Sequence, residues 1–121
     1  MNIAILGYEK GRRDDLETHL RACLEQDADV NITQYEMNRE HINLERPPVP
    51  CAVFVIIDEE TALLDAKKVS YWGKSYPMVM VATHPQYAIE GIRQKVRHYI
   101  LFPLDREEIT EALVRAGVVR D

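Results

Sequence analysis

The sequence predicts an α/β domain built on a doubly wound, five-stranded parallel sheet. Short apolar runs alternate along the chain with segments in which apolar residues recur at helical spacing. The run at 51–57 is apolar at every position, which is typical of a central strand covered on both faces. The chain has 121 residues, which suits one compact domain, and no repeat or long linker interrupts it. We therefore predict a single domain over residues 1–121.

The N-terminal half contains three predicted strands and two helical segments. The apolar run 2–6 predicts the first strand, and in 12–24 apolar residues recur at i, i+4, i+7 and i+8, which predicts a helix. Residues 30, 32 and 34 alternate with polar residues, which predicts a weaker second strand over 30–34. The segment 37–45 is expected to form a short or irregular helix that a proline-rich loop ends. The central strand 51–57 follows.

The C-terminal half repeats the alternation. Asp58 is expected to cap a helix that reaches about residue 71, and strand 78–82 follows it. The segment Thr83–Gln86 has the form of a capping box and predicts a helix to about residue 95. A short strand at 98–101 leads to a last helix with an acidic start at Asp105 and a stop at Gly117.

This order is strand–helix five times, which predicts a flavodoxin-like (βα)5 fold with strand order 2-1-3-4-5. In such folds the functional crevice lies at the carboxyl ends of the strands. The loops that follow the strands are therefore the place to look for function.

Composition excludes several classes of function. Hydrophobic residues make up 46% and charged residues 29%, as in globular proteins. The net charge is −5, from 15 basic and 20 acidic residues, so we expect no direct nucleic-acid binding by this domain. The longest apolar run has seven residues, too few to span a membrane, and the N-terminus resembles no signal peptide, so we expect a cytoplasmic protein.

Residue types that carry chemistry are scattered. The four histidines lie away from cysteines and carboxylates at ligand spacing, so we expect no metal site and no cofactor. No nucleophile–base pair appears, so we expect no independent enzyme. Cys23 and Cys51 are expected to be buried structural thiols rather than a redox pair. The basic pair Arg12-Arg13 is either a solvated helix face or an anion or partner contact, and Tyr71, Trp72 and Tyr76 either cover the core or form a contact site.

Four segments resemble the receiver domains of response regulators. Residues 87–92 and 98–105, Tyr-Ala-Ile-Glu-Gly-Ile and His-Tyr-Ile-Leu-Phe-Pro-Leu-Asp, are similar to the receiver pattern YALEAF…DYLLKPxD, in the form typical of receivers joined to LytTR-type DNA-binding domains. Residues 3–9 are similar to IAIVDDE, and 53–57 to VFLDI. The resemblance covers nearly the whole chain and implies a role in signal transduction and transcription regulation within a two-component system.

The resemblance also shows what this chain lacks. Receivers use two acidic residues after the first strand and an aspartate at the end of the third to hold Mg²⁺, and that aspartate accepts a phosphoryl group. A Thr or Ser and a Lys hydrogen-bond the phosphoryl oxygens. These positions fall here on Gly7, Tyr8, Ile56, Ala82 and Phe102. Isoleucine cannot form an acyl phosphate, and these side chains offer at most one phenol oxygen to a metal.

We therefore expect a pseudo-receiver that keeps the fold and works without phosphorylation, through contacts with a protein partner or as a homodimer. Two alternatives stay open. Asp58, with Glu9 and Thr83 as the remaining acidic and hydroxyl groups, could support phosphorylation if strand 51–57 slipped by two residues. The pocket beside Ile56 and Phe102, with Ala82 and Tyr8, could instead bind a small molecule.

The resemblance also implies a contact surface, formed by 87–97, 98–101 and 105–115. Tyr99 takes the position of the family's mobile aromatic ring, and we expect packing to hold it in one state. The bond between Phe102 and Pro103 is expected to be cis. A DNA-binding domain could follow residue 121. The other residues expected on the contact surface are Tyr87, Arg93, Arg97, Asp105, Glu108 and Arg115.

Overall fold

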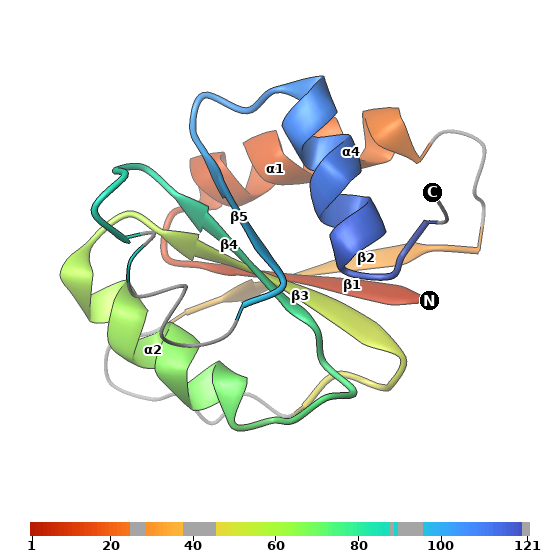
Figure 1. Cartoon of the computed structure of the whole chain (residues 1–121), viewed down its shortest axis with the longest axis horizontal. Coiled ribbons are helices and arrows are strands. Elements are labelled where there is room, and N and C mark those ends of the chain that lie inside the picture. Colours follow the sequence, from red (N-terminus) through yellow and green to blue (C-terminus); the bar gives the residue numbers. More distant parts are fainter. Residues whose placement is uncertain (25–28, 38–45, 88, 90–95, 120–121) are drawn as a thin grey trace.

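A computed structural model describes residues 1–24, 29–37, 46–87, 89 and 96–119. In this part of the chain, five strands form one parallel sheet in the order β2-β1-β3-β4-β5 (Figure 1). The predicted fold class and strand order are confirmed. The elements are β1 Asn2–Gly7, α1 Lys10–Cys23, β2 Asn31–Glu36, β3 Cys51–Ile57, α2 Glu60–Ser70, β4 Met78–Ala82, β5 His98–Leu101 and α4 Arg106–Arg115.

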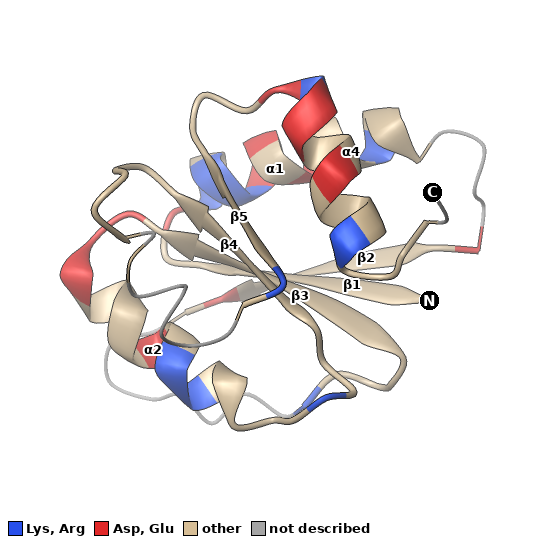
Figure 2. Cartoon of the chain, viewed as in Figure 1, with Lys and Arg blue, Asp and Glu red and all other residues tan. Residues whose placement is uncertain are grey.

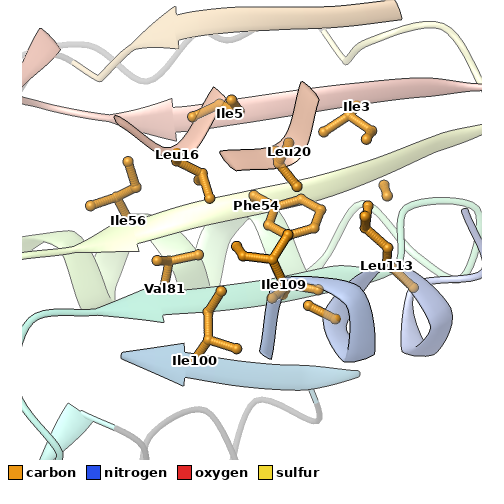
Figure 3. Packing of buried hydrophobic residues seen from close by; sticks show 14 of the residues in the cluster. Ile3, Ile5, Leu16, Leu20, Phe54, Ile56, Val81, Ile100, Ile109 and Leu113 are labelled. Carbon is orange, nitrogen blue, oxygen red and sulfur yellow. The ribbon is translucent and has the colours of Figure 1, made fainter. Parts of the chain in front are cut away.

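The described helices cover both faces of the sheet, with α1 and α4 on one side and α2 on the other (Figure 1). All seven side chains of β3 are buried, as its unbroken apolar sequence predicts. Its even-numbered residues pack under α1 and α4, where Phe54 lies between Leu20 and Ile109 (Figure 3). Its odd-numbered residues pack against α2, where small side chains such as Ala62 and Ala66 bring the helix close to the sheet.

Hydrogen bonds just beyond the strands draw the carboxyl ends of the sheet together. The amide of Met37 donates to the carbonyl of Gly7 at 2.9 Å. The amide of Thr83 donates to Ile57 at 3.0 Å, and the amide of Phe102 donates to Ala82 at 2.9 Å. This edge, formed by the ends of β1, β3, β4 and β5, is called the carboxyl edge below.

Several helix starts differ from prediction. Helix α1 begins at Lys10, two residues early. Helix α2 begins at Glu60 with Glu59 as its N-cap residue, because the backbone stays extended one residue beyond Asp58. The hydroxyl of Thr83 contacts the Ile57 carbonyl at 3.4 Å and His84 Nδ1 at 2.8 Å, neither of which is the amide that a capping box would use. The helices expected over 37–45 and from 83 to 95 fall largely outside the described residues.

The end of the chain follows the prediction more closely. The side chain of Asp105 caps α4 by accepting a hydrogen bond from the amide of Glu107 at 3.2 Å. The chain leaves the helix through Gly117, whose φ of +76° favours glycine. The Phe102–Pro103 bond is cis, as expected, and so is Val49–Pro50.

The two cysteines lie on opposite faces of the sheet. Cys51 is buried on the α2 side, and Cys23 packs half-buried against the core under α1 and α4. Both are free thiols. Among the described helices, none is long and apolar enough to cross a membrane.

The core under α1 is expected to tolerate truncation poorly. Leu20 is fully buried, so Leu20→Ala should lower the free energy of unfolding by about 2–5 kcal/mol, measured by urea denaturation. Leu64→Ala is the matched control, because Leu64 also lies on a helix but is 64% exposed, and its cost should stay within about 0.5 kcal/mol. Equal losses in both variants would contradict this assignment of the core.

Candidate functional site

The structure brings the five receiver-like positions together at the carboxyl edge. Gly7 lies against Ile56, and Ala82 pairs with Ile57 in the neighbouring strand. The amide of Phe102 donates to the Ala82 carbonyl, which fixes the end of β5 beside the end of β4. Ile56 and Ala82 are fully buried. The five positions therefore lie at one edge but on two faces of the sheet. Gly7, Ile56 and Phe102 lie on the side of α1 and α4, and Tyr8 and Ala82 lie on the side of α2.

Gly7 has no room for a side chain. A Cβ at this position would lie 3.2 Å from both Cβ and Cδ1 of Ile56 and 3.3 Å from Cγ of Arg13. These distances are shorter than ordinary van der Waals contacts between carbon atoms. The space that a carboxylate would need after β1 is filled by Ile56 and by the stem of Arg13.

Arg13 is a buried cation that the sequence analysis placed on a solvated helix face or in a partner contact. Its Nη1 donates to the carbonyl of Gly7 at 2.8 Å and to that of Tyr8 at 3.2 Å. Its Nε donates to Oε1 of Gln34 at 3.2 Å. Arg13 lies three residues before Leu16 and seven before Leu20, on the apolar face of α1, and this spacing is the signal that could have located it.

Tyr8 extends to the other face of the sheet, where its phenol donates a hydrogen bond to Oδ2 of Asp65 on α2. Burial, and after it the hydrogen bond that Tyr8 donates to Asp65, raises the pKa of Tyr8 to about 12, so the ring stays neutral. Asp65 is itself buried and was not foreseen. It falls on the stripe of α2 that also contains Ala62, Ala66 and Val69, so its position on the helix indicated burial.

Arg12 covers Phe102, the residue that the sequence resemblance aligns with the receiver lysine. The guanidinium carbon of Arg12 lies 4.6 Å from the centre of the Phe102 ring, which is a cation–π contact. The positive charge at this edge thus comes from α1 and rests on an aromatic face.

Asp58 is the acidic residue closest in sequence to the end of β3. Its Oδ1 is buried and has no hydrogen-bond partner among the described residues. Burial raises the pKa of Asp58, and the negative charges of Glu9 and Glu59 raise it further, while Arg12 lowers it. Glu9 and Asp58 are therefore close enough to interact, whereas the Thr83 hydroxyl is engaged with Ile57 and His84.

The side chains at the receiver-like positions do not fit a Mg²⁺ ion. Magnesium requires near-octahedral oxygen ligands. Gly7 and Ile56 supply no side-chain oxygen, and the phenol of Tyr8 is directed to Asp65. In the described ranges, no group of three or more His, Cys, Asp or Glu side chains is placed to hold a metal ion.

The expected contact surface is only partly as predicted. Tyr87 is buried against the α2 face and makes an edge-to-face contact with His84 at 5.8 Å, so it is not a surface residue. Tyr99 is 41% exposed and lies beside His98. That packing holds its ring in one state stays a prediction. Arg93 lies outside the described residues. The remaining expected residues, Arg97, Asp105, Glu108 and Arg115, are exposed.

Solved structures share this fold, although no protein-family model and no curated protein sequence matches the chain. A response regulator receiver protein from Pseudoalteromonas atlantica matches with a TM-score of 0.70 and 14% identity over 97% of each chain. A response regulator CheY-like protein from Mesorhizobium loti matches with a TM-score of 0.66 and 16% identity, over 95% of this chain and 97% of that one.

A third structure, a putative pilus assembly protein from Burkholderia thailandensis, matches with a TM-score of 0.64 and 17% identity over 98% of this chain and 99% of that one. At these identities the likeness establishes the fold, which is that of response-regulator receiver domains.

Replacing glycine by alanine should have opposite effects on stability at Gly7 and at Gly11. Gly7→Ala should lower the free energy of unfolding by about 1–3 kcal/mol, because the new methyl group overpacks Ile56 and Arg13. Gly11→Ala on α1 has open space around it and should raise that free energy by up to about 1 kcal/mol. Urea denaturation measures both. An unchanged free energy of unfolding in Gly7→Ala would contradict the tight packing of Ile56 and Arg13 against Gly7.

The environment of Asp58 predicts a pH-dependent gain in stability. Because folding raises the pKa of Asp58, its charged form destabilises the folded protein. This destabilisation is complete above the raised pKa and is absent below the unfolded value of 3.8. Asp58→Asn should therefore raise the midpoint of thermal unfolding at pH 7, and the gain should disappear as the pH falls below 3.8.

The control for Asp58 is Asp105→Asn. It removes the same charge from an exposed N-cap position, where asparagine caps about as well as aspartate. It should give no gain at pH 7. If both variants gave the same gain, relief of general negative charge rather than the burial of Asp58 would be responsible.

Proposed function

We propose that this chain is a receiver-type domain that acts in signal transduction through protein–protein contacts and without phosphorylation. The observation that carries the proposal is the closed carboxyl edge. Ile56 stands where receivers have the acceptor aspartate, and it fills the space above Gly7 together with Arg13. No nucleophilic oxygen and no room for a hydrated metal remain at those two positions. We also propose that the domain is not an enzyme.

Phosphorylation of Asp58 is the first alternative, and its surroundings weigh against it. A raised pKa disfavours the carboxylate that must attack phosphorus, and Glu9 and Glu59 add negative charge beside it. Arg12, whose charge lowers the pKa of Asp58, lies over the ring of Phe102. Stabilisation of an incoming phosphoryl group would require that Arg12 leave this contact.

A small molecule in the apolar pocket is the second alternative. Such a ligand needs an open cavity of a few hundred Å³. Ile56 and Ala82 are fully buried, and a methyl group on the side of Gly7 that faces Ile56 would be crowded by Ile56 and Arg13. Tight packing at this edge supports a structural rather than a ligand-binding role for these residues.

The surface over β5 and α4 suits a protein contact. Tyr99 offers an exposed ring, and Arg97, Glu108 and the pair Glu111–Arg115, joined at 2.8 Å, surround it with mixed charge. Mixed charges of this kind favour specificity and register over bulk affinity. We propose that a protein partner or a second copy of the chain binds here. The association with a LytTR-type DNA-binding segment stays a prediction from the sequence.

The range of proteins that share the fold supports a role in binding. The Burkholderia thailandensis neighbour is named for pilus assembly, and another neighbour, from Sinorhizobium meliloti, is named as a putative pilus assembly protein as well. Proteins so named use the same architecture over nearly their whole solved chains. We therefore propose that this domain, too, uses the receiver fold as a contact module.

A phosphodonor experiment tests the proposal. The chain is incubated with acetyl phosphate and Mg²⁺, and the intact mass is measured beside a phosphorylatable receiver domain as positive control. We expect no gain of a phosphoryl group. A gain that is lost in Asp58→Asn but kept in Asp105→Asn would contradict the proposal and assign phosphorylation to Asp58.

A further inference from the structure

A cavity of about 300 Å³ lies at the opposite end of the sheet, where β4 begins. Strand β4 has five residues, so this cavity is roughly 13 Å from the carboxyl edge along the strand. Its volume is at the lower limit for small-molecule sites. It is lined by Ser70, Tyr71, Gly73, Lys74, Tyr76, Pro77, Met78 and Arg97.

The wall of the cavity is held firmly. The hydroxyl of Tyr76 donates to the carbonyl of Pro47 at 2.5 Å, and its ring packs edge-on against Trp72 at 5.3 Å. The amide of Tyr76 donates to Gly73 at 3.1 Å, which closes a turn. The amide of Arg97 donates to the carbonyl of Met78 at 2.8 Å, which ties the start of β5 to the cavity floor. A pre-formed wall lowers the entropic cost of binding.

The charge of the cavity is one-sided. Lys74 and Arg97 both line it, and none of the described lining residues is acidic. Among the described residues, neither of these cations has a carboxylate partner, in contrast to Lys10, Arg21 and Arg115, which pair with carboxylates on their own helices. Figure 2 shows further basic positions at the end of α2 and the acidic positions gathered on α4 and near the helix starts. Two unneutralised cations that face one cavity attract an anion.

An aromatic ring completes the site. Tyr71 lines the cavity and is 72% exposed, although Trp72 beside it packs against the core. An exposed ring at the rim can stack on a planar group while the cations bind an attached anion. Of the two readings that the sequence left open for this aromatic cluster, Trp72 and Tyr76 serve the core, and Tyr71 is left for contact.

We propose that this cavity binds a small organic anion in which a phosphate or carboxylate group is attached to a planar ring. Lys74 and Arg97 would bind the anionic group, and the ring of Tyr71 would stack on the planar one. The site shares no residue with the carboxyl edge, and it shares only Arg97 with the surface over β5 and α4 that we propose for protein contacts.

Binding of AMP to the whole chain, followed by the amide NMR signals of Gly73, Lys74 and Arg97, tests the proposal. Inorganic phosphate and adenosine are titrated in parallel as the anion and the ring alone. We expect AMP to shift these signals at lower concentration than either part does. No shift with any of the three, or equal affinity for AMP and inorganic phosphate, would overturn the proposal.

Variants distinguish the cavity from a diffuse basic surface. Lys74→Ala and Arg97→Ala should each weaken AMP binding about tenfold, and Tyr71→Ala should weaken AMP binding but not phosphate binding. Lys68→Ala is the matched control, because Lys68 is an exposed lysine near the end of α2 that does not line the cavity. If Lys68→Ala weakened binding as much as Lys74→Ala, non-specific electrostatic attraction would replace the proposed site.

Discussion

The contact between Ile56 and the backbone of Gly7 determines how the carboxyl edge is built. Neighbouring strands lie about 4.8 Å apart, so side chains at adjacent positions on one face must share the same space. A glycine beside an isoleucine fills that space with one apolar group, whereas two carboxylates would need a cation and water between them. The tight packing at this edge is therefore a consequence of the side chains that β1 and β3 place beside each other.

The polar side chains of Arg13 and Tyr8 beside this contact are hydrogen-bonded, which avoids the cost of burying them without partners. Arg13 uses its guanidinium to satisfy the carbonyls of Gly7 and Tyr8 and is held further by Gln34. Tyr8, displaced to the other face, hydrogen-bonds the buried carboxylate of Asp65. One end of β1 is thereby joined to α1 on one side and to α2 on the other. Buried charges of this kind cost free energy unless fully hydrogen-bonded, so they favour a specific arrangement more than they add stability.

The sequence predicted strands β3, β4 and β5 at 51–57, 78–82 and 98–101 to the residue. Pro or Asp bounds the first two of these apolar runs, which locates their ends. It also identified Gly7 and Ile56 as neighbours, through the resemblance. It missed Arg13 and Asp65, because periodicity assigns polar residues to solvent even where their spacing puts them on the buried face. The prediction of Tyr87 as a surface residue was wrong. It came from the contact surface of receiver domains, whereas the ring of Tyr87 is buried in this chain.

Net charge does not decide what this protein binds, because charge acts locally. At physiological ionic strength the screening length is about 8 Å, so a cavity responds mainly to its own lining. On α1 and α4, Lys10, Arg21 and Arg115 are each paired with a carboxylate one turn away. Lys74 and Arg97 have no such neighbour in the described part of the chain. The overall charge of −5 therefore argues against a long polyanion such as nucleic acid, which would meet the acidic faces, but not against a small anion.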